Sequence, residues 1–238
     1  MVVEGVSRFL VLELLESFGD EIHSLYEIIV IADSHTPAEV TDSLTISPKV
    51  RLEKFNEPFN FSKKCNLGAR CSSGEIILFL NDDMLSLSTG WVTKLQHQFS
   101  DPSVGGVGGL LLTPDGFVQC AGHANMPRPH LYGVGKDPRD PAFQQQLAVV
   151  RITDGLSGAC FAVRRSDYME VGGMCEELPS SYNDVDLGFK LKGLGKKLIY
   201  VPDIQYVHYE SISRDPMVSE AETALIWRRW GRYFEYNL

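Results

Sequence analysis

Short apolar runs alternate with amphipathic segments through the first half of the chain, and this alternation limits the fold more than any other feature. The runs YEIIVIAD, KVRLEKF and EIILFL have the length of strands; the first is rich in β-branched residues, and the second alternates between apolar and polar residues. The segments between them, TPAEVTDSL and NFSKKCNLGARCSSG, have the capping residues and the period of helices. Such a series predicts an α/β fold in which a mainly parallel sheet is flanked by helices.

The rest of the chain extends this series. Residues 8–24 predict one helix with a broad apolar face, and STGWVTKLQHQFSD predicts another. Residues 182–195 predict a helix that ends at a glycine, and residues 196–202 predict a final core strand. The tail, AETALIWRRWGRYFEYNL, predicts an aromatic and basic helix. Because no linker, repeat or low-complexity tract divides the sequence, we expect a single domain over residues 1–238.

Residues 113–150 interrupt the regular pattern. The run TPDGFVQCAGHANMPRPHLYGVGKDPRDPAF is rich in Gly, Pro and His and has no sustained period. We expect a hairpin followed by a long surface loop, of the kind that forms a lid or a wall of a binding site.

Composition argues against several classes of protein. The net charge of −9 and the pI near 5.2 do not suit a nucleic-acid-binding surface, which is basic. The longest apolar runs are far shorter than the roughly 20 residues that span a bilayer. The N-terminus carries acids and no small-residue cleavage site, which argues against a signal peptide. The 5 cysteines include no CxxC pair and fit a reducing compartment, so we expect a cytoplasmic protein.

The apolar run Ile76–Leu80 ends on Asn81, Asp82 and Asp83. In α/β sheets the ligand lies at the carboxyl ends of the strands, where Asp33 is also expected. Adjacent carboxylates repel each other unless a cation neutralises them, and Mg²⁺ and Mn²⁺ prefer oxygen ligands. The tripeptide therefore indicates a metal site, although a polar strand end with Asp82 as a cap fits the sequence as well.

Two further polar groups lie at the ends of predicted elements. Asp184 and Asp186 open the helix in YNDVDLGFK, where they either face a crevice or cap the helix. His208 follows the final strand, where it is either structural or completes the coordination of a metal held by Asp83. The chain contains no phosphate loop, nucleophile elbow or dinucleotide-binding turn. Together the clusters predict a metal-dependent transfer of a group that carries a diphosphate.

These residues belong to runs that resemble a known family. VRLEKFNEPFNFSKKCNLGARCSSGEIILFLNDDM resembles the donor half of family 2 glycosyltransferases with the GT-A fold. TPDGFVQCAG, SGACFAVRRSDYMEVGG, YNDVDLGFKLKGLG and VHYESISR resemble the branch found in bacterial O-antigen and rhamnan assembly. The resemblance covers about residues 26–214 in the family's order. It implies a nucleotide-sugar donor half over residues 1–112 and an acceptor half with a C-terminal helix over residues 113–238.

The resemblance implies roles for particular residues. Asp33 matches the acid that contacts the nucleotide base, and Asn66 and Asp82 would also contact the donor. Asp83 matches the last acid of the DxD-type motif, which is the principal metal ligand. His208 matches the histidine that closes the metal site, and the implied cofactor is Mg²⁺ or Mn²⁺.

Asp184 matches the catalytic base of an inverting transfer. It would take the proton from the acceptor hydroxyl as that oxygen attacks the anomeric carbon. The implied enzyme moves a hexosyl or deoxyhexosyl group from a nucleotide-diphosphate sugar to a glycan or lipid-linked acceptor in cell-surface polysaccharide synthesis. No nucleic-acid partner is expected. The aromatic tail would either dock on the core or contact the inner face of the membrane.

The chain departs from the family pattern at several positions. The family's first strand, which ends in a Pro-Thr-Arg-like segment, has no match before Tyr26, so either it is missing or SRFLVLEL has become that strand. Asn81 stands where many members have Asp, and Ala32 replaces an acid. Met174 and Cys175 replace Phe-Asp after the double glycine. Loss of a central strand would expose two sheet edges.

Two other functions therefore stay open at the level of sequence. A catalytically silent, truncated binding or scaffold domain fits the missing strand. A metal-dependent nucleotidyltransferase shares the sheet and the carboxylates, but it usually has a Gly-rich basic loop near the first strand, and the sequence shows none.

Overall fold

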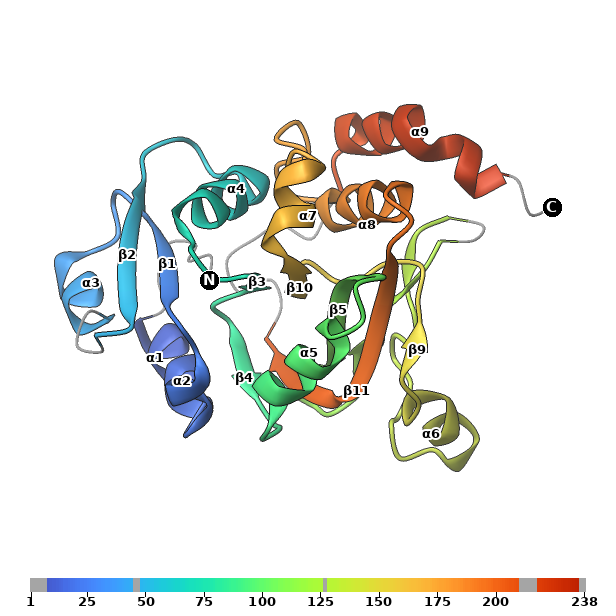
Figure 1. The fold of residues 1–238 in the computed structure, drawn as a ribbon, viewed down its shortest axis with the longest axis horizontal. Coiled ribbons are helices and arrows are strands. Elements are labelled where there is room, and N and C mark those ends of the chain that lie inside the picture. The colour runs from blue at the N-terminus through green and yellow to red at the C-terminus, as the bar shows by residue number, and fades with distance from the viewer. Residues whose placement is uncertain (1–7, 45–47, 126–127, 210–217, 236–238) are drawn as a thin grey trace.

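A computed structural model describes residues 8–44, 48–125, 128–209 and 218–235 (Figure 1). Its helices are α1 (Arg8–Ser17), α2 (Glu21–Ser24), α3 (Ala38–Leu44), α4 (Phe61–Cys71), α5 (Trp91–Phe99), α6 (Pro141–Leu147), α7 (Arg165–Glu170), α8 (Asn183–Gly193) and α9 (Glu220–Glu235). Its strands are β1 (Ile28–Asp33), β2 (Val50–Phe55), β3 (Ile76–Leu80), β4 (Met84–Ser86), β5 (Val104–Leu112), β6 (Val118–Cys120), β7 (His123–Ala124), β8 (His130–Leu131), β9 (Arg151–Ile152), β10 (Cys160–Arg164) and β11 (Lys197–His208).

The central sheet has the strand order β3-β10-β5-β11-β4, with β6 beside β5 and β9 beside β11. β5 and β11 are parallel, whereas β10 runs antiparallel to both β3 and β5. β1 and β2 form a separate, two-stranded parallel sheet (Figure 1). The expected α/β fold is confirmed, and its pairing is mixed because the chain enters β10 from an irregular segment instead of a helical crossover.

The sequence expectation of one helix over residues 8–24 is wrong in one respect, because the segment forms α1 and α2. A turn at Phe18–Asp20 separates them, and Gly19 has a φ of +51°, which lies in the left-handed region that glycine adopts without strain. Residues 8–14 of SRFLVLEL are helical, so the alternative that this segment becomes the missing strand is also wrong. No described strand pairs with both β1 and β3 to join the two sheets.

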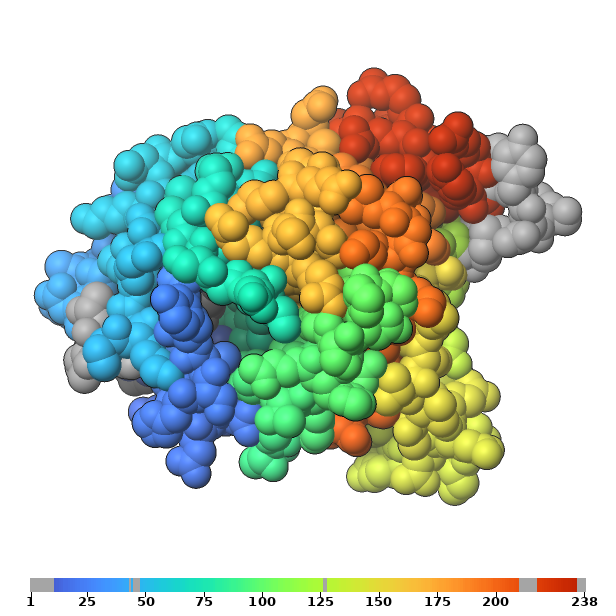
Figure 2. All heavy atoms as spheres, viewed as in Figure 1, coloured from blue at the N-terminus to red at the C-terminus, as the bar shows by residue number. Residues whose placement is uncertain are grey.

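Helices cover both faces of the central sheet (Figure 1), and the atoms of α5, α7 and α8 lie at the surface on the side that Figure 2 shows. On one face, α1 and α5 bury Leu14, Trp91 and Leu95 against the sheet. On the other face, α4, α7 and α8 bury Cys65, Tyr168 and Leu187. Burial on both faces explains why the central strands read as continuous apolar runs in the sequence.

β11 is longer than the strand expected over residues 196–202, and this extension positions a functional residue. It runs 12 residues, to His208, with an irregular register between Tyr200 and Gln205. Close contact with β5 depends on glycine, since a Cβ on Gly109 would lie 2.1 Å from the Ile204 carbonyl oxygen. The final residue of β11 thereby reaches residues 81–83, which link β3 to β4.

The irregular segment predicted over residues 113–150 contains the expected hairpin, β5–β6, but also a helix that was not expected. Asp140 caps α6 by accepting a hydrogen bond from the Ala142 N–H at 2.9 Å, and Pro141 occupies the first position of the helix. This Asp-Pro pair is a helix-start signal. Its presence in the run KDPRDPAF could have predicted α6.

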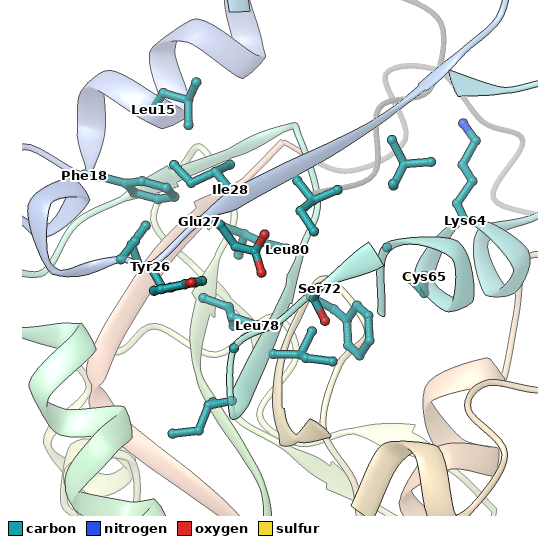
Figure 3. A pocket seen from close by; sticks show the side chains of 18 of the residues that line it. Leu15, Phe18, Tyr26, Glu27, Ile28, Lys64, Cys65, Ser72, Leu78 and Leu80 are labelled. Atoms are coloured by element: carbon teal, nitrogen blue, oxygen red, sulfur yellow. The ribbon is translucent and has the colours of Figure 1, made fainter. Parts of the chain in front are cut away.

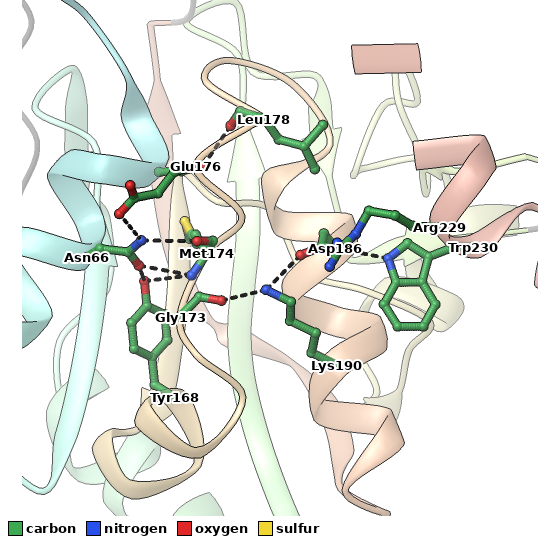
Figure 4. Close-up of polar contacts among 11 residues, drawn as sticks. Asn66, Tyr168, Gly173, Met174, Glu176, Leu178, Asp186, Lys190, Arg229 and Trp230 are labelled. Carbon is green, nitrogen blue, oxygen red and sulfur yellow. Dashed lines mark hydrogen bonds and ion pairs between the residues drawn. The ribbon is translucent and has the colours of Figure 1, made fainter. Parts of the chain in front are cut away.

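The tail helix α9 docks on α8. The Phe189 and Trp230 rings stack with centroids 5.0 Å apart, and Asp186 accepts hydrogen bonds from Arg229 Nε and Trp230 Nε1, both at 2.7 Å (Figure 4). Phe234 is buried in the same cluster. The apolar side of the helix therefore packs on the core. Within the described part of the chain, no helix has both the length and the apolar character needed to cross a bilayer.

Candidate active site

Strand pairing brings two of the predicted site residues together. β4 runs antiparallel to β11, and the register places His208 opposite Met84. The Tyr209 N–H donates to the Asp83 carbonyl oxygen at 3.0 Å. As a result, His208 Nε2 lies 3.1 Å from Asp83 Oδ1, and both side chains are mostly buried.

A neighbouring glutamine determines which nitrogen of His208 faces Asp83 with a lone pair. His208 Nδ1 lies 2.7 Å from Gln119 Oε1, which can only accept a hydrogen bond. Nδ1 therefore carries the proton in the neutral ring, and Nε2 keeps its lone pair. Asn81 Nδ2 lies 3.3 Å from the same Nε2. This arrangement, with one nitrogen held by an amide oxygen and the other directed at a carboxylate, is typical of a metal-ligating histidine.

The acids at the end of β3 lack a strong counter-charge. Asp83 Oδ1 and Asn81 Oδ1 are buried without a hydrogen-bond partner in the described residues. The pKa of Asp82 is raised to about 7, first because burial removes water from the carboxylate and then because Asp83 lies beside it. No Lys or Arg of the described residues forms an ion pair with Asp83; its close partner is His208. A cation at this point would neutralise the pair.

These residues fit a divalent ion that keeps open positions. The described residues hold no group of three or more His, Cys, Asp and Glu side chains suited to a metal, so the chain offers Asp83 and His208 as a pair. Mg²⁺ and similar ions are commonly held by one or two protein ligands together with substrate phosphates and water. Neighbouring ligands on such an ion lie roughly 3 Å apart, which is close to the observed separation.

Asp184 lies in the first turn of α8 and faces the loop before β10. Its Oδ2 accepts a hydrogen bond from the Gly158 N–H at 2.8 Å. The preceding Tyr182 has a φ of +60°, a left-handed conformation that is uncommon for a non-glycine residue and often marks functional sites. The Ala159 carbonyl oxygen accepts from the Asn81 N–H at 3.1 Å. The two residues Gly158 and Ala159 thus connect Asp184 to the acids at the end of β3.

A histidine that the sequence reading missed lies beside Asp184. His123 is buried, and its Nε2 is 3.8 Å from Asp184 Oδ2. Both of its ring nitrogens are buried without a hydrogen-bond partner in the described residues. Burial lowers the pKa of His123, and the charge of Asp184 opposes this shift only in part. The ring is therefore neutral at pH 7. No signal in the run CAGHAN distinguishes it from a loop residue.

Asp33 ends β1 as predicted, and it already has a counter-ion. Lys64 Nζ lies 2.8 Å from Asp33 Oδ1, and the lysine side chain is completely buried. Its ammonium group also lies over the rings of Phe55 and Phe59, at 5.6 and 5.2 Å from their centroids. The carboxylate of Asp33 is therefore neutralised within the fold.

The amide of Asn66 is fully engaged within the protein (Figure 4). Its Oδ1 accepts from the Tyr168 hydroxyl at 2.6 Å and the Met174 N–H at 2.9 Å. Its Nδ2 donates to the Met174 carbonyl and to Glu176 Oε1, both at 3.0 Å. Gly173 makes this contact fit, because a Cβ there would lie 2.3 Å from Asn66 Oδ1. The donor contact expected for Asn66 stays a prediction, and it would require these bonds to break.

A known protein family matches more than half of this chain. Residues 10–172 match the family described as Glycosyl transferase family 2. The chain belongs to this family. The resemblance seen in the strand ends and in the later runs of the sequence is therefore confirmed.

Two curated relatives lie in the branch that the sequence resembles. The O-antigen biosynthesis protein RfbC of Myxococcus xanthus is 29% identical over 198 residues, which are 79% of this chain and 15% of that protein. The N-acetylglucosaminyl-diphospho-decaprenol L-rhamnosyltransferase of Mycobacterium tuberculosis is 34% identical over 127 residues, which are 48% of this chain and 41% of that protein. The chain thus matches less than half the length of each relative.

Solved glycosyltransferase structures share the fold. GalNAc-T7 with UDP, GalNAc and Mn²⁺ superposes with a TM-score of 0.75 at 16% identity, over 98% of this chain and 48% of that chain. The mannosyltransferase PcManGT from Pyrobaculum calidifontis, in complex with GDP-Man and Mn²⁺, gives a TM-score of 0.61 at 19% identity, over 96% and 59%. The GT-A fold expected from the sequence is confirmed.

Proposed function

We propose that this family 2 glycosyltransferase domain moves a sugar from a nucleotide-diphosphate donor to a hydroxyl of a glycan or lipid-linked acceptor in polysaccharide synthesis. The contact between Asp83 Oδ1 and His208 Nε2 at 3.1 Å carries the proposal, because it joins two separately predicted ligands at the carboxyl end of β3. The names of the two curated relatives support the polysaccharide context. Residues 1–112 would form the donor half and residues 113–238 the acceptor half.

Asp83 and His208 would hold the divalent ion, with Gln119 fixing the ring of His208. The ion, Mg²⁺ or Mn²⁺, would offset the charge on the leaving nucleoside diphosphate. Asp82 would face the ribose and the diphosphate, and Asp33 would face the base. The two solved structures contain Mn²⁺ with nucleotides or nucleotide sugars, which supports Mn²⁺ as the first ion to test.

Asp184 would act as the base of an inverting transfer. Its carboxylate takes the proton of the acceptor hydroxyl while that oxygen bonds to the anomeric carbon and the bond to the diphosphate breaks. The Gly158 N–H holds Oδ2 in place at 2.8 Å. The neutral ring of His123 on the same side excludes water without neutralising the carboxylate.

Calorimetric titration with UDP, GDP and dTDP, each with and without Mn²⁺, tests the metal site. We expect one nucleotide to bind more tightly with Mn²⁺, and Asp83→Ala to lose this gain. Asp203→Ala is the matched control, since Asp203 is exposed and lies away from the site. If no nucleotide shows a metal-dependent gain, the proposal fails and the silent binding domain becomes the better reading.

Asp184→Asn separates chemistry from binding. In the presence of acceptor, we expect the rate at which nucleoside diphosphate is released to fall by about 10²–10⁴-fold, which is the usual contribution of a general base. Nucleotide affinity should stay close to that of the wild type, because Asp184 lies on the acceptor side. If Asp184→Asn lost both the transfer rate and the nucleotide affinity, Asp184 would be a structural residue.

A further inference from the structure

The C-terminal half of α9 collects cations and aromatic rings at the surface. Residues 226–234, IWRRWGRYF, contain three arginines and no acid, although the whole chain has a net charge of −9. Trp227 is 39% exposed and Tyr233 is 47% exposed. The helix lies at the edge of the molecule, beyond α8, and its atoms form part of the surface (Figures 1 and 2). The charge of this helix surface is therefore opposite in sign to that of the chain as a whole.

The period of α9 separates two faces of the helix. Ile226 and Phe234 are buried in the cluster that α9 shares with α8. The outer face consists of the exposed residues Ala221, Ala224, Trp227, Arg228 and Arg232. Because the two alanines are small, a flat surface can approach the indole and the two guanidinium groups of this face closely.

The two arginines of the outer face are not neutralised by acids. Among the residues that the structure describes, neither Arg228 nor Arg232 forms an ion pair. The Arg232 guanidinium donates to the Tyr233 hydroxyl at 3.1 Å and lies over that ring, 4.9 Å from its centroid. Arg229 differs, because its Nε donates to the buried Asp186 at 2.7 Å and so holds α9 on the core (Figure 4). The outer face thus presents two positive charges on a helix that is fixed in place.

The indole of Trp227 is fixed on the outer face by its packing. A Cβ on Gly231 would lie 3.1 Å from the Trp227 ring, so the indole covers this glycine one turn later in the helix. The ring also meets Phe234 with centroids 5.0 Å apart and an interplanar angle of 81°. Tryptophan has an apolar ring with a polar N–H, and for this reason it is enriched where a bilayer meets water.

The cleft between β1 and β3 is a surface of another kind (Figure 3). It has a volume of about 180 Å³ and is lined mainly by apolar side chains, among them Phe18, Ile31 and Leu78. Lys64 also lines it, and its ammonium group lies 2.8 Å from Asp33 Oδ1. The lysine of the cleft thus has an internal partner, whereas the arginines of the outer face have no acidic partner in the described part of the chain. An anionic surface is therefore complementary to the outer face of α9.

We propose that the outer face of α9 docks the protein on the anionic surface of a lipid bilayer. Arg228 and Arg232 lie against the phosphate groups of the lipids, and the indole of Trp227 enters the interfacial layer. The rest of the chain is acidic and is repelled by such a surface, so contact through α9 also sets the orientation of the molecule.

The docked face is linked rigidly to the candidate active site. Glu222, in the first turn of α9, accepts hydrogen bonds from the Ser180 and Ser181 N–H groups, both at 2.8 Å. These serines directly precede α8, which carries Asp184 in its first turn. Docking through α9 therefore holds the helix of Asp184 at a defined place relative to the bilayer.

The first test is sedimentation of the full chain with lipid vesicles, which needs neither a donor nor an acceptor and is therefore independent of sugar transfer. We expect the protein to pellet with vesicles of equal parts phosphatidylcholine and phosphatidylglycerol, and to stay in solution with phosphatidylcholine alone. A rise in ionic strength from about 0.1 M to about 1 M should release it, because the screening length falls from about 10 Å to about 3 Å. No difference between the two kinds of vesicle overturns the proposal.

Charge variants locate the surface. Arg228→Gln combined with Arg232→Gln should weaken binding to the anionic vesicles by about 25-fold, because each arginine near such a surface contributes about fivefold. Lys136→Gln combined with Arg139→Gln is the matched control, since it removes the same charge from exposed residues near α6. The control should bind like the wild type. If both double variants lose the same affinity, the attraction comes from total charge and the proposal fails.

The fluorescence of the wild type gives a readout that does not depend on whether a variant folds. Lipids with brominated acyl chains quench indoles that enter the bilayer, and Trp227 is the exposed one, since Trp91 is 1% exposed. We expect quenching when the wild type binds anionic vesicles, and less quenching in Trp227→Leu. A bound wild type whose emission is unchanged would have α9 facing away from the bilayer, which overturns the proposal.

Two other occupants of the outer face would give different results. Inorganic phosphate, added at constant ionic strength, would release the protein from anionic vesicles if the face binds separate phosphate groups. If a second copy of the chain covers the face, sedimentation velocity without vesicles would show a dimer that the double arginine variant converts to a monomer. We expect neither result, and either one overturns the proposal.

Discussion

The strands β1 and β3 both end on acids, but the fold supplies a cationic partner at only one of these two ends. At the end of β1, Asp33 is paired with Lys64, whose ammonium group lies 2.8 Å away. At the end of β3, Asp82 and Asp83 lie together beside His208, and the pKa of Asp82 is raised to about 7 because of burial and the neighbouring charge. A carboxylate with an internal counter-ion belongs to the architecture. Carboxylates without one indicate where a cation from solution is needed.

Removal of the internal counter-ion should have the largest effect. Lys64→Met leaves Asp33 buried beside an apolar side chain, and we expect the free energy of unfolding to fall by about 3–5 kcal/mol. Lys63→Met is the control, since Lys63 pairs with Glu57 at the surface and such pairs contribute little. Urea denaturation of both variants makes the comparison. If the two variants lost the same free energy of unfolding, the Asp33 carboxylate would not depend on Lys64 as its buried counter-ion.

The second prediction sharpens the other side of the comparison. Gln119→Leu removes the acceptor that holds the ring of His208, and we expect Mn²⁺ affinity to fall by about 10–100-fold, as for other partners of metal-bound histidines. Gln96→Leu changes an exposed glutamine on α5 and should leave the affinity unchanged. Titration followed by Mn²⁺ electron paramagnetic resonance measures both. Unchanged affinity in Gln119→Leu would exclude His208 as a ligand.

The acids at the end of β3 should also make the stability of the protein depend on pH. A carboxyl group whose pKa is raised on folding holds its proton longer in the native state, so stability falls as the pH rises from about 4 to about 7. Asp82→Asn removes this loss. We expect the metal-free variant to match the wild type near pH 4 and to be more stable at pH 8, by on the order of 1–2 kcal/mol because the group is partly exposed. Thermal unfolding of both proteins at the two pH values tests this. If the prediction is wrong, the difference in stability between Asp82→Asn and the wild type will be the same at pH 4 and pH 8.

The smallest effect is expected for His123. Its neighbour Asp184 is an intermediate case, because this acid has neither a lysine nor a second acid beside it but a histidine with a lowered pKa. Protonation of His123 in acid would pair it with Asp184 and remove the base. His123→Gln keeps a neutral side chain, so we expect the rate near pH 8 to change by less than about tenfold and the fall in rate below pH 6 to be weaker than in the wild type. Profiles of transfer rate against pH test this, and superimposed acid limbs would remove His123 from the mechanism.

Several features could be predicted because they depend on local patterns. Asn60 caps α4 by accepting from the Lys63 N–H at 2.9 Å, as its position before a helical run indicates. The apolar run of β3 had to end where polar residues begin, so Asp83 lies at a strand end. These predictions need no more than the sequence on either side of each residue.

Other features depend on residues that are distant in the sequence. The sequence assigned Asn66 to the donor, but contacts with Tyr168 and Met174 engage all of its amide. His123 gave no signal because its importance comes from Asp184, which the fold brings to 3.8 Å. The sequence of the C-terminal helix favoured docking on the core and left membrane contact as the alternative, and its packing on Phe189 became apparent only in three dimensions.

The sequence by itself determined the α/β class, most of the helices and the acids at the ends of the strands, because period, capping and chain direction are local properties. Only the tertiary structure decided which acids are neutralised, which nitrogen of His208 faces Asp83, and that β1 and β3 face each other across a cleft. The physical reason is that charge compensation and strand pairing are energies between groups far apart in the chain. No local pattern records them until the fold brings those groups into contact.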